Sequence, residues 1–270
     1  MRVRDRLQLA DAEIHYEVTG EGPAIVFAHG LGGNHMSWYQ QVPHFSQRFT
    51  CVTFAHRGFT PSRELEEGRG PAAFPADLAA LIDHLKLDRV VLVAQSMGGW
   101  SCLPYALSFP NRVRGLVMAC TGGANYRLIE GLKIDGLESY DAWAAERRTE
   151  YERDGIHPAG GARLAREQPA AHFLYREIDD LTPAAAKQGL RKRMFENPAP
   201  SAAALAALQI PVVFFTGDDD VVFPPVVAQA MAKVMPNAQV ERFAAGHSIY
   251  FERPAEFNAA LDRFIAALPA

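Results

Sequence analysis

Short apolar runs recur along most of the chain, and each of them ends at turn-forming residues. The first run alternates apolar and polar positions, as a half-exposed strand does, whereas most of the others are almost continuously apolar. The runs cover Ile14–Val18, Ala24–Ala28, Thr50–Ala55, Val90–Ala94, Val113–Cys120, Pro211–Thr216 and Val240–Phe243. Runs of this length and β-branched content predict the buried strands of a parallel sheet.

Apolar residues at helical spacing lie between several of these runs. They predict helices over Phe74–Leu85, Met97–Phe109 and Pro254–Leu268. Strands that alternate with helices predict an α/β fold, in which right-handed crossovers place helices on both faces of the sheet.

The alternation stops between about Thr121 and Gln209. This stretch holds a charged helical segment around Ala144–Arg153 and an alanine-rich run at Ser201–Ala207, without a strong β pattern. We therefore expect a mostly helical insertion between two strands, lying as a lid over one edge of the sheet.

Composition narrows the class of protein. The 270 residues are 49% apolar and 21% charged, with a net charge of −4, so the charge offers no attraction for nucleic acid. No polybasic cluster, signal-peptide pattern or membrane-length apolar stretch is present, and we expect a cytoplasmic protein without a membrane partner. Three cysteines, all within apolar runs, are expected to be reduced buried thiols: Cys51, Cys102 and Cys120.

A serine directly follows the valine-rich run, in the sequence Ala94-Gln95-Ser96-Met97-Gly98-Gly99. A nucleophile at a tight strand-to-helix turn has a strained backbone, which requires small residues two positions away on either side. Ala94 and Gly98 meet that requirement, and the turn would aim a helix N-terminus at developing negative charge. The alternative is a serine that caps an ordinary helix.

A glycine-rich loop, His29-Gly30-Leu31-Gly32-Gly33, follows the run that ends at Ala28. Its glycines would let the backbone approach the serine, so the N–H groups of Leu31 and Met97 are candidate oxyanion-hole donors. A turn without a ligand is the alternative, and the patterns of phosphate and dinucleotide loops are absent. His29 itself is expected to be structural.

Two further loops follow the last two apolar runs: Gly217-Asp218-Asp219-Asp220 and Ala245-Gly246-His247-Ser248. A carboxylate at a strand end can orient an imidazole and stabilise its cation. Because three adjacent aspartates repel one another, one is expected to point inward, and spacing leaves open which. Of nine histidines, His247 is best placed to reach the sheet edge that carries Ser96. No cluster shows metal-ligand spacing, so we expect neither a metal nor a cofactor.

Taken together, these motifs resemble the α/β-hydrolase superfamily, in which serine, aspartate and histidine follow in this chain order. The resemblance rests on Gly22-Pro23, His29-Gly30, His56-Arg57-Gly58, the Ser96 turn, Gly217 with Asp220 and Pro224, and Gly246-His247 with Glu252 and Pro254. It implies a catalytic triad of Ser96, Asp220 and His247. It also implies a helical cap at residues 122–209 over a core formed by residues 1–121 and 210–270. The chain departs from many relatives at His56, where they carry aspartate.

These residues predict a serine esterase or lactonase that acts on a small, largely apolar molecule through an acyl-enzyme. The fold does not fix the substrate. A carbon–carbon bond hydrolase for ring-cleavage products is one alternative, and its cationic anchor could be Arg176, Arg191 or Arg193. A cofactor-independent oxygenase and a ligand sensor with a moving lid are others. Residues that could line a pocket or pack within the cap are Trp143, His157, His172, Phe173 and Tyr175.

Overall fold

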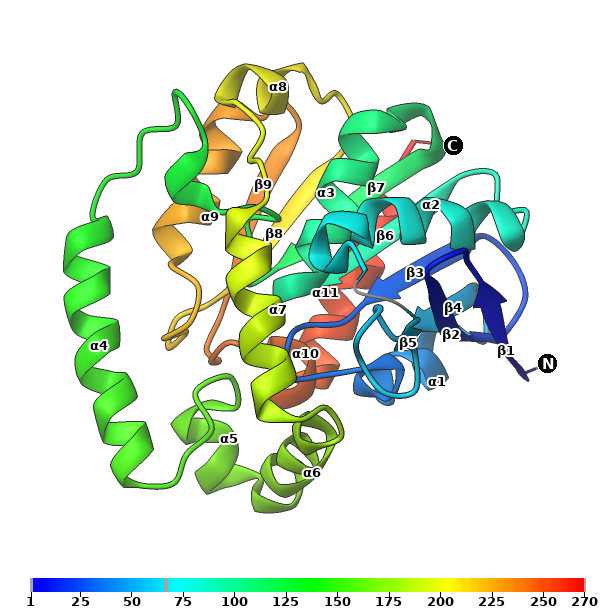
Figure 1. Ribbon diagram of the computed structural model, residues 1–270. Coiled ribbons are helices and arrows are strands. Elements are labelled where there is room, and N and C mark those ends of the chain that lie inside the picture. Colours follow the sequence, from blue (N-terminus) through cyan, green and yellow to red (C-terminus); the bar gives the residue numbers. More distant parts are fainter. Residues whose placement is uncertain (1, 66–67, 270) are drawn as a thin grey trace.

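The computed structural model describes residues 2–65 and 68–269 (Figure 1). Its centre is one sheet with the strand order β1-β2-β4-β3-β6-β7-β8-β9, to which β5 adds by pairing with β2. The strands are β1 (Arg2–Gln8), β2 (Ala12–Thr19), β3 (Ala24–Ala28), β4 (Thr50–Phe54), β5 (Arg63–Glu64), β6 (Val90–Gln95), β7 (Val113–Ala119), β8 (Val212–Gly217) and β9 (Ala238–Phe243). All pairs from β4 to β9 are parallel, whereas β2 pairs antiparallel with β1, β4 and β5.

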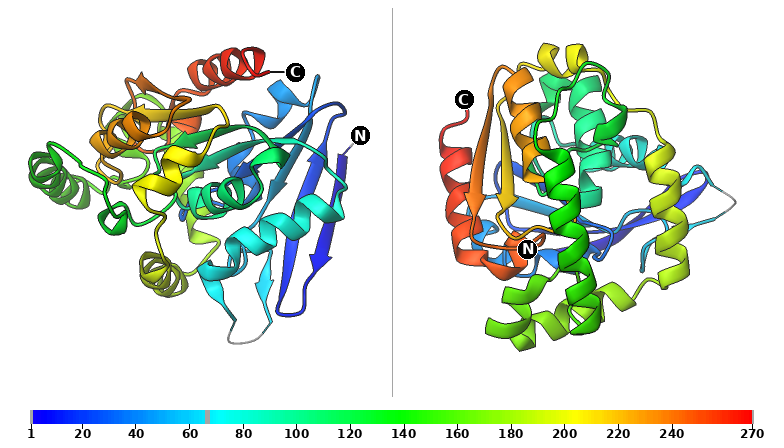
Figure 2. Two further views of the ribbon diagram at one scale, coloured as in Figure 1. Left: turned by 90° about the horizontal axis from the view of Figure 1, so that it is seen from above. Right: turned by 90° about the vertical axis from the view of Figure 1, so that its left-hand side faces the viewer.

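Helices cover both faces of this sheet, so the predicted α/β class is confirmed. Figure 2 shows α11 on one face and α2 and α3 on the other. The helices outside the long insertion are α1 (Val42–Phe45), α2 (Phe74–His84), α3 (Gly99–Ser108), α9 (Pro225–Val234), α10 (Ile249–Glu252) and α11 (Pro254–Ala266). The predicted helices agree with α2, α3 and α11 to within about two residues at most boundaries, which is the usual uncertainty of helix ends.

Only helices and short 3₁₀ turns occur between β7 and β8 in the structure described. They are α4 (Leu137–Arg153), α5 (Gly161–Glu167), α6 (Pro169–Asp180), α7 (Ala184–Glu196) and α8 (Ala202–Ala207). Helix α4 lies on the opposite side of the molecule from β1 and β2, and α5 and α6 lie at the lower end of the view (Figure 1). Within the described residues, no helix combines the length and the hydropathy that crossing a membrane requires.

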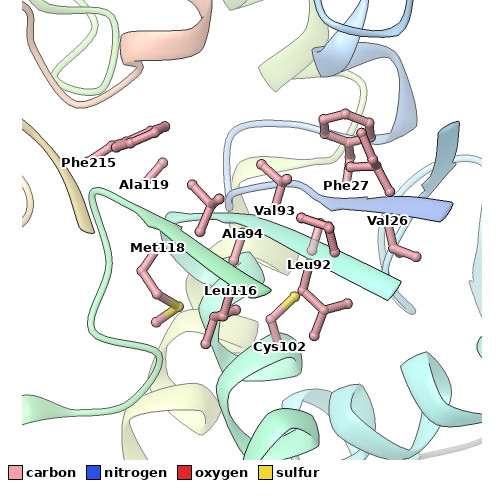
Figure 3. Packing of buried hydrophobic residues seen from close by; sticks show 14 of the residues in the cluster. Val26, Phe27, Leu92, Val93, Ala94, Cys102, Leu116, Met118, Ala119 and Phe215 are labelled. Atoms are coloured by element: carbon pink, nitrogen blue, oxygen red, sulfur yellow. The ribbon is translucent and has the colours of Figure 1, made fainter. Parts of the chain in front are cut away.

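The apolar strands pack on both of their faces, which explains their continuous hydrophobicity. Successive side chains of a strand point to opposite faces of the sheet. Phe27 and Val93 therefore lie on one face, and Leu92, Leu116 and Met118 lie on the other (Figure 3). Every residue of β3, β6 and β8 is buried.

Four strands differ from the sequence expectation, and one of them is the two-residue strand β5, which was not predicted. Strand β1 was not predicted, because nearly all of its residues are charged or exposed and its stability comes from backbone pairing with β2. Strand β2 pairs antiparallel rather than parallel. Strand β9 was expected to be buried, but most of its residues are exposed or half-buried, because it is the other edge of the sheet.

A buried ion cluster follows β4. The Arg57 side chain is fully buried and forms two hydrogen bonds of 2.7 Å to the Asp77 carboxylate. It also pairs with Asp11 at 2.8 Å and with Glu64 at 3.2 Å. The guanidinium groups of Arg57 and Arg69 hold the pKa of Asp11 well below its usual range.

Replacing Arg57 with methionine is expected to lower the free energy of unfolding by about 3–5 kcal/mol, because the Asp77 carboxylate would stay buried without its cation. Urea unfolding measures this loss. Arg263→Met is the control, since it breaks an exposed ion pair with Glu241 that is worth at most about 1 kcal/mol. Equal losses in the two variants would show that the Arg57 cluster does not stabilise the fold.

Candidate active site

Ser96 occupies a strained turn between β6 and α3. Its φ angle is 48°, in the left-handed region that residues with side chains rarely adopt. A short 3₁₀ turn, Ser96–Gly98, leads into α3. A methyl group at Gly98 would overlap the carbonyl of Ala28, so the turn can pass β3 only because this position lacks a side chain. The structure thus places Ser96 at a tight, strained strand-to-helix turn (the elbow).

The glycine-rich loop after β3 lies against this turn. A methyl group at Gly30 would overlap the Gln95 side chain and would lie 3.1 Å from the Ser96 Cβ atom. Leu31 and Met97 line the same cavity as Ser96. The backbone N–H groups of Leu31 and Met97 therefore belong to two segments that lie beside Ser96, namely the glycine-rich loop after β3 and the turn after β6.

Asp220 and His247 form a buried hydrogen-bonded pair. The His247 Nδ1 atom lies 2.9 Å from Asp220 Oδ2 and 3.0 Å from Oδ1. Oδ1 also accepts the N–H groups of Val222, at 2.8 Å, and Phe223, at 3.0 Å. Such a carboxylate fixes the ring orientation and makes Nδ1 the protonated nitrogen of the neutral ring.

The other two aspartates of this loop point away from the histidine. Asp218 pairs with Arg242 at 2.8 Å, and Asp219 pairs with Arg163. Asp220 is 1% exposed. The inward-pointing aspartate, which spacing alone left open, is therefore the one that the family resemblance implied.

Ser96 and His247 line one cavity of about 730 Å³. Gln95 ties their two segments together, because its side-chain amide donates to the His247 carbonyl at 3.2 Å. Gln95 belongs to the sequence motif around Ser96, but its contact with the His247 loop was not predicted. The outer walls come from the chain between β7 and β8 and include Tyr126, Tyr140, Arg148, His157, Tyr175, Asp179, Lys187, Arg191, Met194 and Phe195.

Only some of the candidate lining residues belong to this cavity. His157 and Tyr175 do, whereas Trp143 and His172 do not, and Phe173 is 65% exposed.

A carboxylate on the cavity wall already has two nitrogen-bearing side chains beside it. Lys187 Nζ lies 2.6 Å from Asp179 Oδ2, and His157 Nε2 lies 3.5 Å from the same oxygen. These neighbours lower the pKa of Asp179 against the effect of its burial. Arg191 also lines the cavity, and it forms no ion pair with any residue that the structure describes. Of the three arginines considered as anchors, Arg176 and Arg193 are not in the lining.

Two buried histidines beside the site, His29 and His56, form hydrogen bonds with groups outside the Asp220–His247 pair. His29 bonds the Gly30 carbonyl through Nδ1, at 2.7 Å, and accepts the His56 N–H at Nε2, at 3.0 Å. Burial lowers the pKa of His29 to about 3, so the ring is neutral, as its expected structural role requires. His56, where the chain departs from many relatives, lies with Nε2 2.7 Å from Ser101 Oγ and thereby contacts α3.

In the part of the chain that the structure describes, two groups of side chains are close enough to share a metal ion, although the sequence showed no ligand spacing. One is Cys120 with Asp220 and His247, and the other is His15 with Glu17 and His35. Neither donor set suits a cation. In the first group, the ligand atoms of Asp220 and His247 are hydrogen-bonded to each other. In the second, the Glu17 carboxylate already forms ion pairs with the guanidinium groups of Arg2 and Arg4.

Comparison with known proteins identifies relatives along nearly the whole chain. The family model described as the alpha/beta hydrolase fold matches residues 23–254. A putative non-heme bromoperoxidase, BpoC, from Mycobacterium tuberculosis is 29% identical over 94% of this chain and 98% of its own. The 3-oxoadipate enol-lactonase 2 of Acinetobacter baylyi is 25% identical over 96% of this chain and 95% of its own. A solved hydrolase from Pseudomonas aeruginosa has the same fold, with a TM-score of 0.79 at 20% identity and 98% coverage of both chains.

Proposed function

The chain belongs to the α/β-hydrolase fold family, and on that premise we propose that it is a serine hydrolase that cleaves carboxylic esters or lactones. Ser96 is the nucleophile, His247 the general base and acid, and Asp220 the group that orients the histidine. The observation that carries this proposal is the buried Asp220–His247 pair, because its imidazole lines the same cavity as the strained serine.

The proposed reaction has two halves. His247 Nε2 takes the proton of the Ser96 hydroxyl, whose oxygen attacks the carbonyl carbon, and the backbone N–H groups of Leu31 and Met97 bind the oxyanion. The carbonyl re-forms, the carbon–oxygen bond to the alcohol breaks, and His247 gives its proton to the leaving alkoxide. A water molecule deprotonated by His247 then attacks the acyl-enzyme, which releases the acid and restores Ser96.

A small, largely apolar substrate fits the proposed site. The volume of about 730 Å³ is typical of small-molecule pockets. Leu31, Met97, Trp100, Met194 and Phe195 supply apolar wall close to the elbow and on α7. Residues 122–209 act in this proposal as a cap over the core formed by residues 1–121 and 210–270. The enol-lactonase relative supports an ester-type bond, since a lactone is a cyclic ester.

A carbon–carbon bond hydrolase is the second candidate, and Arg191 is the observation that favours it. Its guanidinium lies on the cavity wall without an ion-pair partner among the described residues, and it could hold the carboxylate of a ring-cleavage product. Turnover of a vinylogous diketone acid, faster than that of any simple ester, would decide for this reaction.

The proposed function is tested with p-nitrophenyl esters graded from acetate to laurate, together with a fluorophosphonate probe. We expect hydrolysis that is fastest for short acyl chains and falls once the chain outgrows the cavity. The probe should label one serine per chain, and peptide mapping should place the label at Ser96. A protein that neither hydrolyses these esters nor reacts with the probe would refute a serine hydrolase.

A further inference from the structure

Helix α5 lies directly on the loop that carries His247. A methyl group at Gly246 would lie 3.6 Å from the Gly161 Cα atom, so the start of α5 and this loop are in close contact. The other end of the helix is also attached. Gln168 Nε2 donates to the Glu252 carbonyl at 2.7 Å, and Arg253 pairs with Glu167 at 3.0 Å. Helix α5 and the residue that follows it thus contact the chain on both sides of α10.

Glu252 is a fully buried carboxylate beneath this contact. Its Oε2 atom accepts the Gly246 N–H at 2.8 Å, next to His247 in the chain. Its Oε1 atom is buried and has no hydrogen-bond partner within residues 2–65 and 68–269. Burial raises the pKa of Glu252, whereas its hydrogen bond from Gly246 and the nearby guanidinium groups of Arg253 and Arg163 act in the opposite direction. A carboxylate in such a place needs a cation to stay ionised.

Arg163 of α5 supplies that cation and reaches a second loop as well. Its Nε atom lies 3.4 Å from Glu252 Oε1, which makes an ion pair, and neither atom forms a hydrogen bond with any residue that the structure describes. Its NH2 group pairs with Asp219, the residue before Asp220. The backbone joins the same two loops, since the Asp219 N–H donates to the Ala245 carbonyl at 3.0 Å.

We propose that Arg163 is a positioning residue that pairs with Asp219 and Glu252 at once and thereby holds the Asp220 loop and the His247 loop in register. The inference rests on the proposed function of Asp220 and His247. In this inference, Arg163 of α5 sets the alignment of Asp220 and His247, although it does not line the cavity that contains Ser96. Small displacements of catalytic groups lower the rate strongly, by about 10²-fold for a shift of about 1 Å.

The first test compares Arg163→Gln with Arg166→Gln, which removes an exposed arginine from the same helix. In Arg163→Gln we expect kcat per fluorophosphonate-reactive site to fall by about 10- to 100-fold. KM should change by less than about twofold, since the substrate does not contact Arg163. Arg163→Lys keeps the charge but cannot span both partners, and should lie between wild type and Arg163→Gln. An Arg163→Gln variant with the kcat of Arg166→Gln would overturn the proposal.

The second test asks whether Arg163 acts through Glu252. In Glu252→Gln the amide oxygen can still accept the Gly246 N–H, and the buried charge is gone. The double variant Arg163→Gln/Glu252→Gln should therefore recover a large part of the kcat lost in Arg163→Gln alone. A loss of packing alone would not be repaired in this way. Additive losses in kcat would overturn the role assigned to Glu252.

A third measurement separates this inference from the proposed function. If the wild type hydrolyses no ester, the serine hydrolase is refuted, but the alignment of Asp220 and His247 can still be observed. The NMR signal of the His247 ring N–H reports its hydrogen bond to Asp220. That signal should shift in Arg163→Gln and stay in place in Arg166→Gln. An unchanged signal in both variants would overturn the positioning role, whatever the enzyme's substrate.

Discussion

Replacing Ser96 with alanine is expected to lower kcat for p-nitrophenyl ester hydrolysis by about 10⁵- to 10⁶-fold, because the acyl-enzyme can no longer form. The remaining rate would come from oxyanion binding and substrate positioning. The fold should be kept, since alanine retains the Cβ atom of serine and the change removes only a hydroxyl group. Steady-state kinetics with thermal unfolding of the same samples measure both effects.

Ser101→Ala is the matched control for that loss. Ser101 is a buried serine on α3, five positions after Ser96, and it contacts His56 without lining the cavity. Its removal should lower the free energy of unfolding by about 1–3 kcal/mol, because the His56 ring loses its partner, and should leave kcat nearly unchanged. Equal kcat values for wild type and Ser96→Ala would mean that another residue is the nucleophile.

Replacing Asp220 with asparagine is expected to lower kcat by about 10³- to 10⁴-fold with a small change in KM. The asparagine oxygen can still accept the N–H groups of Val222 and Phe223, which turns its NH₂ group toward His247 Nδ1. That nitrogen must then be unprotonated to accept, so Nε2 carries the proton and cannot remove one from Ser96. The imidazolium formed in the reaction also loses its stabilising charge.

Asp218→Asn is the control for the Asp220 variant. It makes the same chemical change two residues earlier, in a side chain that pairs with Arg242 at the surface. Its kcat should equal that of the wild type within about twofold, as exposed ion pairs contribute little. A loss in Asp218→Asn comparable with that in Asp220→Asn would mean that the loop as a whole, rather than one carboxylate, is needed.

The sheet could be predicted where both faces of a strand are buried. β3 and β6 show this most clearly, because each is an unbroken apolar run that ends at a turn. Ser96 and His247 were singled out from the sequence, since each follows a predicted strand and parallel strands bring their carboxyl ends to one edge. Asp220 also follows a predicted strand, but only the family resemblance distinguished it from Asp218 and Asp219. β1 was missed because only one of its residues, Leu7, is buried.

The contacts made by the helices between β7 and β8 could not be predicted from the sequence. In α4 only Ala144 and Tyr151 are buried, so its sequence contains no apolar stripe that reveals the face turned toward the core. The pairing of Arg163 with Glu252 joins residues 89 positions apart (252 − 163) through the packing of α5 on the Gly246 loop. No local pattern encodes such a contact, and the cavity walls on α6 and α7 depend on the same packing.

The charged outer strands also bear on how the molecule behaves in a crowded solution. Both edges of the sheet are open, and a second copy could in principle extend it there by adding a strand. β1 presents a row of arginines at that edge, with Arg2 and Arg4 held by Glu17, and β9 carries Glu241 and Arg242. An incoming strand would have to strip water from these ions, which costs more than its backbone hydrogen bonds return. The charged side chains of β1, which interrupt the apolar pattern expected of a strand, thus protect the folded protein from edge-to-edge aggregation.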